Sequence, residues 1–193
     1  MKDILFQYLK NYTNAPDESL LDVVEQVPIQ SFKKGTLLLE QGEVSSKCYF
    51  VLKGLIRQYF IDSDGNENTS NFYSEKQVAA IYNPQQVHKA SKYFLACLED
   101  SILLVGDLHD EMQMYAKYPF LETMVRKMME ETMANAQDNY ADLLVLSPEA
   151  RYLALLEKRP GLAERVAQNQ LASYLGIKPE SLSRIKRRLN SLK

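Results

Sequence analysis

Residues 168–185 read QNQLASYLGIKPESLSRI and hold two short amphipathic segments on either side of one glycine. The apolar positions recur at helical spacing, at Leu171, Leu175, Leu182, Ile185 and Leu189. Gly176 is the residue type that most readily ends a helix in the left-handed conformation, and Pro179 fits the first turn of a following helix. The pattern predicts helices near 170–175 and 179–189 that are joined by a tight turn.

The second of these helices has a polar and basic outer face. Its outward positions are Glu180, Ser181, Ser183, Arg184, Arg187 and Arg188. A helix of this composition and width fits the major groove of duplex DNA. An αα-hairpin with a solvated charged surface is the alternative, but it needs neither the small Ala172 nor a glycine before a basic helix. The segment therefore predicts a helix-turn-helix that binds DNA.

Charge is distributed unevenly along the chain. The net charge is only −2, yet residues 147–193 carry ten Lys and Arg against four Asp and Glu. A basic module attached to an acidic remainder is typical of proteins with a nucleic-acid partner. The charge distribution alone is also consistent with a basic, solvated surface that binds no partner. The helix-turn-helix pattern within the basic segment favours duplex DNA as the partner.

The middle of the chain has the pattern of an antiparallel β structure. Short β-prone runs are separated by single glycines, and the runs are Thr36–Leu39, Cys48–Leu52, Leu55–Ile61, Thr69–Tyr73 and Ser101–Val105. A hairpin turn is predicted at Asp62-Ser63-Asp64-Gly65. Many short strands at this spacing predict a barrel or sandwich. Helical spacing is found in residues 1–30, with a break at 13–16, and again after Asp107.

A long helix is predicted over residues 120–146, because the segment contains neither Gly nor Pro and Ser147-Pro148 ends it. Its apolar stripe follows steps of three and four residues through Leu121, Val125, Met128, Thr132 and Ala136. Such a stripe can cover the β structure and still pair with a second copy of the helix. Burial wholly within one subunit is the alternative, and we favour a homodimer held by these residues.

Composition disfavours several classes of protein. No apolar run approaches the ~20 residues that span a bilayer, and the N-terminus lacks the layout of a signal peptide, so we expect a cytoplasmic protein without a membrane partner. Two cysteines and two histidines are too few for a zinc cage or a four-cysteine iron–sulfur site. The predicted strands contain no histidine, which argues against a metal enzyme on a β-barrel. We expect no enzymatic activity and no cofactor, with haem ligation through His88 or His109 as the remaining alternative.

The chain resembles the Crp/Fnr family, the bacterial regulators related to the cyclic-AMP receptor protein, over nearly its whole length. The resemblance rests on GTLLLEQG at 35–42, YFVLKGLI at 49–56 and PESLSR at 179–184. It implies an α+β fold with an N-terminal antiparallel β-roll of the double-stranded β-helix or jelly-roll type, a long dimerisation helix and a C-terminal all-α helix-turn-helix. The implied domains are 1–118, 119–146 and 147–193.

The same resemblance implies which residues touch DNA. Family members read bases with an arginine, a glutamate and a second arginine; Glu180 and Arg184 match the last two, and Pro179 replaces the first. From the polar and basic surface of the module we expect phosphate contacts by Asn169, Gln170, Lys178, Ser181, Ser183, Arg187 and Arg188. RNA polymerase is a further partner that the family implies.

A ligand pocket is implied less directly. The family's phosphate-binding pairs fall on Ala80-Ile81 and Ala90-Ser91, so the phosphate-binding arginine is absent. Because a buried phosphate without a cation is costly, we expect cyclic AMP to bind weakly or not at all, unless Lys89 or Lys92 substitutes. The β-roll is then a sensor for an unidentified small-molecule effector, or a scaffold with none. A ligand-binding or interaction module with a vestigial helix-turn-helix is the alternative function.

Overall fold

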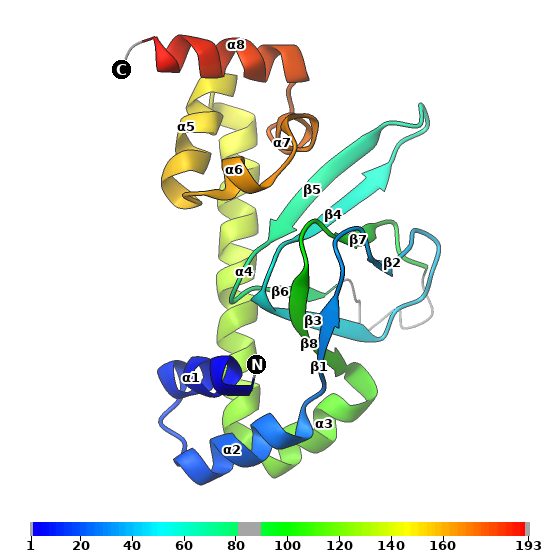
Figure 1. Ribbon diagram of the computed structural model, residues 1–193, viewed down its shortest axis with the longest axis vertical. Coiled ribbons are helices and arrows are strands. Elements are labelled where there is room, and N and C mark those ends of the chain that lie inside the picture. The colour runs from blue at the N-terminus through cyan, green and yellow to red at the C-terminus, as the bar shows by residue number, and fades with distance from the viewer. Residues whose placement is uncertain (1, 81–89, 192–193) are drawn as a thin grey trace. The chain divides into compact units, whose positions relative to one another are not determined.

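The computed structural model describes residues 2–80 and 90–191 of the 193-residue chain (Figure 1). Ile81 and His88 lie outside the described residues, and the side chain of His109 is not described. Two compact units are present, Met1–Gln58 with Phe72–Thr132 and Tyr59–Asn71 with Met133–Lys193. The described residues form two four-stranded sheets and eight helices, which confirms the predicted α+β class.

The helices that precede and follow the strands along the chain belong to the first unit, which contains only the beginning of the last of them. They are α1 (Lys2–Tyr12), α2 (Asp17–Gln26), α3 (Leu108–Lys117) and the beginning of α4 (Pro119–Val145). Pro16 precedes α2 and two acidic residues open it, and negative charge at a helix N-terminus is favourable. Leu5, Leu9 and Leu20 are at most 2% exposed and share an apolar cluster with Phe50 of the sheet. The N-terminal helices therefore cover one face of the β structure.

Eight strands are described. They are β1 (Ile29–Phe32), β2 (Leu37–Leu39), β3 (Lys47–Lys53), β4 (Ile56–Ile61), β5 (Glu67–Tyr73), β6 (Val78–Ala80), β7 (Phe94–Cys97) and β8 (Ser101–Asp107). One sheet has the order β1-β8-β3-β6 and the other β2-β7-β4-β5. In the first sheet, β8 pairs antiparallel with β1 and β3, and β6 pairs antiparallel with β3. Strand order that departs in this way from chain order is typical of jelly-roll-type folds.

Side-chain alternation along β3 separates two cores. Tyr49 and Val51 point between the sheets and share a core with Ile56 and Leu103. Phe50 points to the opposite side, toward the helices. Alternate residues of a strand face opposite sides of a sheet, so a strand covered on both faces must be apolar throughout. Four consecutive residues of β3 are accordingly buried.

Gly54 makes the corner between β3 and β4. Its φ is +109°, which favours glycine over other residues. A Cβ built on Gly54 would lie 2.8 Å from the Cα of Ser101. A side chain therefore does not fit at this corner without movement of the backbone.

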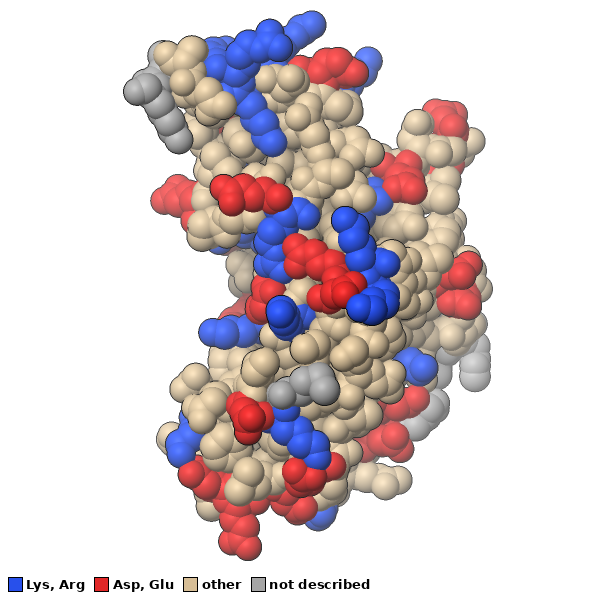
Figure 2. Space-filling view, viewed as in Figure 1, with Lys and Arg blue, Asp and Glu red and all other residues tan. Residues whose placement is uncertain are grey.

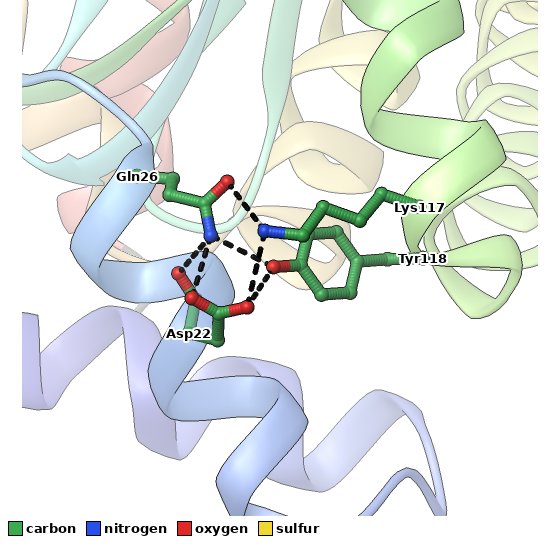
Figure 3. Close-up of polar contacts among 4 residues, drawn as sticks. All are labelled: Asp22, Gln26, Lys117 and Tyr118. Atoms are coloured by element: carbon green, nitrogen blue, oxygen red, sulfur yellow. Dashed lines mark hydrogen bonds and ion pairs between the residues drawn. The ribbon is translucent and has the colours of Figure 1, made fainter.

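A polar cluster ties α2 to the junction of α3 and α4 (Figure 3). Gln26 Nε2 donates to Asp22 Oδ1 at 2.6 Å and to the Tyr118 hydroxyl at 2.7 Å. Lys117 Nζ lies 3.3 Å from Asp22 Oδ2, and the Tyr118 hydroxyl donates to the same carboxylate. The hydrogen bond from Tyr118 is the main cause that lowers the pKa of Asp22 below its ordinary value. The cluster fixes α2 to the beginning of α4.

The second unit contains the end of α4 and four short helices. These are α5 (Pro148–Lys158), α6 (Leu162–Arg165), α7 (Gln168–Tyr174) and α8 (Pro179–Asn190). Ser147 caps α5 by accepting a hydrogen bond from Ala150 N–H at 3.2 Å, and Pro148 occupies its first turn. The single-turn helix α6 was not predicted, whereas α7 and α8 agree with the predicted segments to within two residues.

Candidate nucleic-acid interface

The turn between α7 and α8 has the geometry that the sequence predicts. Gly176 has a φ of +66°, and its N–H donates to the Ser173 carbonyl at 3.0 Å. The N–H of Ile177 donates to the Ala172 carbonyl, also at 3.0 Å. These bonds satisfy carbonyl groups at the end of α7, as is usual where a glycine terminates a helix.

Backbone groups hold the first turn of α8. Pro179 occupies its first position, and the Lys178 carbonyl accepts from Ser181 N–H at 3.0 Å. The exposed side chain of Lys178 stands at the N-cap and makes no capping bond. Gln168 Nε2 donates to the Pro179 carbonyl at 3.2 Å and links the beginnings of α7 and α8.

The inner faces of α7 and α8 form the core of this module. Leu171, Ala172 and Leu182 are 0% exposed, and Leu175 and Ile185 are also buried. Complete burial of one leucine or isoleucine contributes about 1.5–3 kcal/mol. Four of the five leucine and isoleucine residues that the sequence assigns to the inner faces are therefore buried inside the module, and Leu189 is half-buried.

The outer face of α8 is exposed and charged. Among the predicted DNA contacts, the exposed residues are Asn169, Lys178, Glu180, Ser181, Arg184, Arg187 and Arg188, and the half-buried ones are Gln170 and Ser183. Figure 2 shows Lys and Arg atoms gathered over α8. Glu180 and Arg184 are four residues apart and lie on one face of the helix. The structure thus places both implied base-reading residues side by side on an accessible surface.

Arg188 differs from the other arginines of α8, because its guanidinium forms an ion pair with Glu149 of α5. Nearby, Lys186 Nζ lies 5.8 Å from the centre of the Tyr152 ring, which also belongs to α5. Both contacts fasten α8 to α5. The sequence reasoning missed Glu149, because no motif or spacing connects position 149 with position 188.

The stripe of α4 that was expected at the dimer interface is only partly exposed. Leu121 and Met128 are 7% and 6% exposed and belong to the core beneath the N-terminal helices. Val125 and Thr132 are half-buried, and Ala136 is exposed. Toward the end of α4 another apolar series is exposed, at Met133, Tyr140, Leu143 and Leu144. Steps of three and four residues occur along any face of a helix. The sequence therefore could not show which apolar series of α4 is buried and which is exposed.

The residues expected at a ligand pocket have different surroundings. Ala80 pairs with Cys48 and lines a cavity on the helix-covered face of the sheet. Ala90 is exposed. Ser91 braces a loop, because its N–H donates to the Glu43 carbonyl at 2.7 Å and its carbonyl accepts from Gly42 N–H at 2.8 Å. The fourth residue, Ile81, is outside the described residues.

Three further properties bear on the chemistry of the chain. Residues 2–80 and 90–191 contain no cluster of three or more His, Cys, Asp or Glu side chains suited to a metal ion. Within the same ranges, no helix has the length and apolar character needed to cross a bilayer. Burial raises the pKa of both the Cys48 and the Cys97 thiol, so neither is activated as a thiolate.

Comparison with known proteins places these features in a family. The model of the cyclic nucleotide-binding domain matches residues 29–118. An anaerobic regulatory protein of Pasteurella multocida is 26% identical over 192 residues, covering 91% of this chain and 67% of that protein. Regulatory protein HlyX of Actinobacillus pleuropneumoniae is 23% identical over 174 residues, covering 82% of this chain and 68% of its own length.

Solved structures show the same fold at lower identity. FixK2 from Bradyrhizobium japonicum has a TM-score of 0.70 at 17% identity, covering 86% of this chain and 85% of its own. A CRP/FNR family transcriptional regulator from Thermus thermophilus has a TM-score of 0.66 at 19% identity, with coverages of 85% and 86%. The family model spans all eight described strands, and a helix-turn-helix follows them. The chain therefore contains a cyclic nucleotide-binding-type domain ahead of a helix-turn-helix, and it resembles regulators of the Crp/Fnr family over most of its length.

Proposed function

We propose that this chain is a transcription regulator that binds duplex DNA sequence-specifically as a homodimer. One observation carries the proposal: the apolar residues of α7 and α8 are buried in their own module, while Glu180, Arg184 and Arg187 are exposed on the outer face of α8. This is the arrangement of a recognition helix that enters the major groove. A vestigial module would keep its core and lose its basic face, so the intact face favours DNA binding over a pure interaction module.

Each predicted contact residue has a chemical role in this proposal. Glu180 accepts a hydrogen bond from a cytosine amino group, and Arg184 donates to guanine. The phosphate contacts, which fix the register without reading sequence, are Asn169, Gln170, Lys178, Ser181, Ser183 and Arg187. Arg188 contacts phosphate in competition with its ion pair to Glu149.

The homodimer is supported by the end of α4. Met133, Ala136 and Tyr140 are exposed and follow one another by three and four residues, which is the spacing of a coiled-coil seam. Exposed large apolar side chains that form a continuous patch mark an interaction site. We assign the central contact to this series and retain the half-buried Val125 and Thr132 as its continuation toward the beginning of the helix, whereas Leu121 and Met128 are used in the core.

The β domain is the sensor in this scheme. We propose a sensor at 1–118, a dimerisation helix at 119–146 and a DNA-binding domain at 147–193. Ala80 faces the helices and Ser91 braces a loop, which supports weak or absent binding of cyclic AMP and an effector of another kind. RNA polymerase is the second macromolecular partner, because the relatives that the chain resembles are regulatory proteins.

Fluorescence anisotropy with a labelled random-sequence duplex tests DNA binding itself. Affinity should fall steeply as salt rises, and Arg187→Ala should flatten the salt dependence by about one unit per lost phosphate contact. Arg126→Ala is the matched control, because Arg126 is an exposed arginine on α4 outside the module. Binding that ignores salt, or an equal loss in the Arg126 variant, would contradict the proposal.

A further inference from the structure

A large cavity lies within the first unit, between its helices and the sheet β1-β8-β3-β6. Its volume is about 890 Å³, in the range of roughly 300–1,000 Å³ that is usual for small-molecule sites. Leu5, Leu9 and Met128 line it and are at most 6% exposed. The wall formed by these residues therefore belongs to the core of the unit, and the cavity opens to solvent where the exposed Lys47, Asp110 and Met129 line it.

The cavity lies on the helix-covered face of the sheet. Phe50 and Leu104 line it, whereas their neighbours Tyr49 and Leu103 point into the core between the two sheets. Successive residues of a strand face opposite sides. The cavity is therefore separated from the space between the sheets by the sheet itself.

A row of small residues makes room for the cavity. Cys48 pairs with Ala80 on one neighbouring strand and with Gly106 on the other, and all three line the cavity. A Cβ at Gly106 would lie 2.5 Å from Cys48 Sγ, so the cysteine already fills the space above the glycine. Because no large side chain rises from this row, the helices and the sheet stay apart here.

The walls are adaptable and one end is acidic. Four of the seven methionines in the chain line the cavity, Met114, Met124, Met128 and Met129. Methionine side chains are flexible and adjust to ligands of different shape. Among the described residues, the charged side chains that line it are Asp107, Asp110 and Glu111 against a single Lys47. An excess of carboxylates favours a cationic group and disfavours an anionic one.

We propose that this cavity binds a small apolar molecule that carries an amine. The apolar part lies among the methionines above the row Ala80, Cys48 and Gly106, and the ammonium group lies near the carboxylates at the beginning of α3. This inference goes beyond the proposed function, since it gives an effector both a place and a chemical class. Its test involves no DNA, so it stands or falls separately from DNA binding.

Three probes of equal chain length test whether the cavity prefers a cationic, a neutral or an anionic head group. They are decylamine, decanol and decanoate, each used below its critical micelle concentration. With methyl-labelled methionine, NMR should show decylamine shifting the signals of Met114, Met124, Met128 and Met129. The exposed Met112 and Met133 should not respond. Calorimetry should give decylamine an affinity about tenfold or more above that of decanoate.

Two variants and one matched control locate the site. Ala80→Leu fills the floor and should weaken decylamine binding about tenfold or more, while Ala80→Ser should bind as the parent does. Asp110→Asn changes only an exposed side chain. It should reduce the difference in affinity between decylamine and decanoate, because one carboxylate near the ammonium group is removed. Unchanged signals of the four cavity methionines with every probe would overturn the proposal. Equal affinity for decanoate, or responses confined to Met112 and Met133, would overturn it as well.

Discussion

Helices α8 and α4 both carry apolar stripes, but the structure uses the stripes differently. In α8 the apolar positions Leu182 and Ile185 are buried, and the exposed face is polar and charged. In α4 the apolar residues are buried only near its beginning, and Tyr140 and Leu144 are 65% and 67% exposed near its end. A surface that is already polar fits a hydrated, charged partner such as DNA. A helix face that remains apolar calls for another protein surface.

The largest effect is expected when the exposed series of α4 is made charged. Met133→Glu combined with Tyr140→Glu places like charges within an apolar seam, and their desolvation is unfavourable. Light scattering at micromolar concentration should show the mass falling from about twice 22.2 kDa to that of one chain. Asn135→Glu adds the same charge on another side of α4 and should leave the dimer intact. A dimeric double variant, or a monomeric parent, would remove the contrast between the two helices.

The next largest effect concerns the turn between α7 and α8, which sets the direction of α8. Gly176→Ala should cost about 1–2 kcal/mol of stability, because φ is positive there and a Cβ would lie 3.1 Å from Leu143 Cδ1 of α4. Gly161→Ala is the matched control, since φ is also positive but nothing lies within 4 Å of its Cβ. Urea unfolding of both variants gives the difference. If Gly161→Ala proves the more costly, the contact with Leu143 does not constrain the turn.

Local signals account for what could be predicted from sequence. Ser147-Pro148, Gly176 and Pro179 punctuate the chain, and the helix boundaries that they imply agree with the structure. These residues act through their own backbone preferences, so no distant contact is needed to interpret them. The inner face of the helix-turn-helix was predictable for the same reason.

Features that depend on distant partners could not be predicted. The strands β1, β6 and β7 contain only three or four residues, too few to show an alternating pattern, and pairing with remote strands stabilises them. Leu121 and Met128 are buried because α1 and α2 cover them, a fact that no pattern within α4 reveals. The ion pair between Glu149 and Arg188 joins helices whose packing is known only from the fold.

That ion pair gives a smaller prediction. Both partners keep substantial solvent exposure, so a double-mutant cycle with Glu149→Ala and Arg188→Ala should give a coupling of about 0.2–1 kcal/mol. Glu149→Ala alone releases Arg188 toward phosphate and should strengthen non-specific DNA binding slightly. Chemical unfolding and anisotropy titrations measure the two effects. Zero coupling together with weaker DNA binding by Glu149→Ala would show that the pair does not restrain Arg188.

The smallest prediction concerns the anchored beginning of α4. The pKa of Asp22 in the folded protein is lowered, first by the hydrogen bond from Tyr118, so its contribution to stability is present above its unfolded value of about 4. That contribution is lost as the pH falls through the folded pKa. The stability difference between the parent and Asp22→Asn should therefore shrink below pH ~4. A difference that is constant from neutral to acid pH would mean that the charge of Asp22 does not stabilise the junction.

Selection from a random DNA library tests the central claim most directly, namely that α8 reads bases through Glu180 and Arg184. The parent should select an inverted repeat with half-sites about 10 bp apart, because two-fold protein symmetry requires two-fold symmetry in the site. Arg184→Ala should bind the selected site about 1–3 kcal/mol more weakly and lose preference at one position of each half-site. Arg187→Ala should keep the motif and bind all sequences more weakly. A parent that selects no motif, or an Arg184→Ala variant that selects the parent's motif unchanged, would contradict the account.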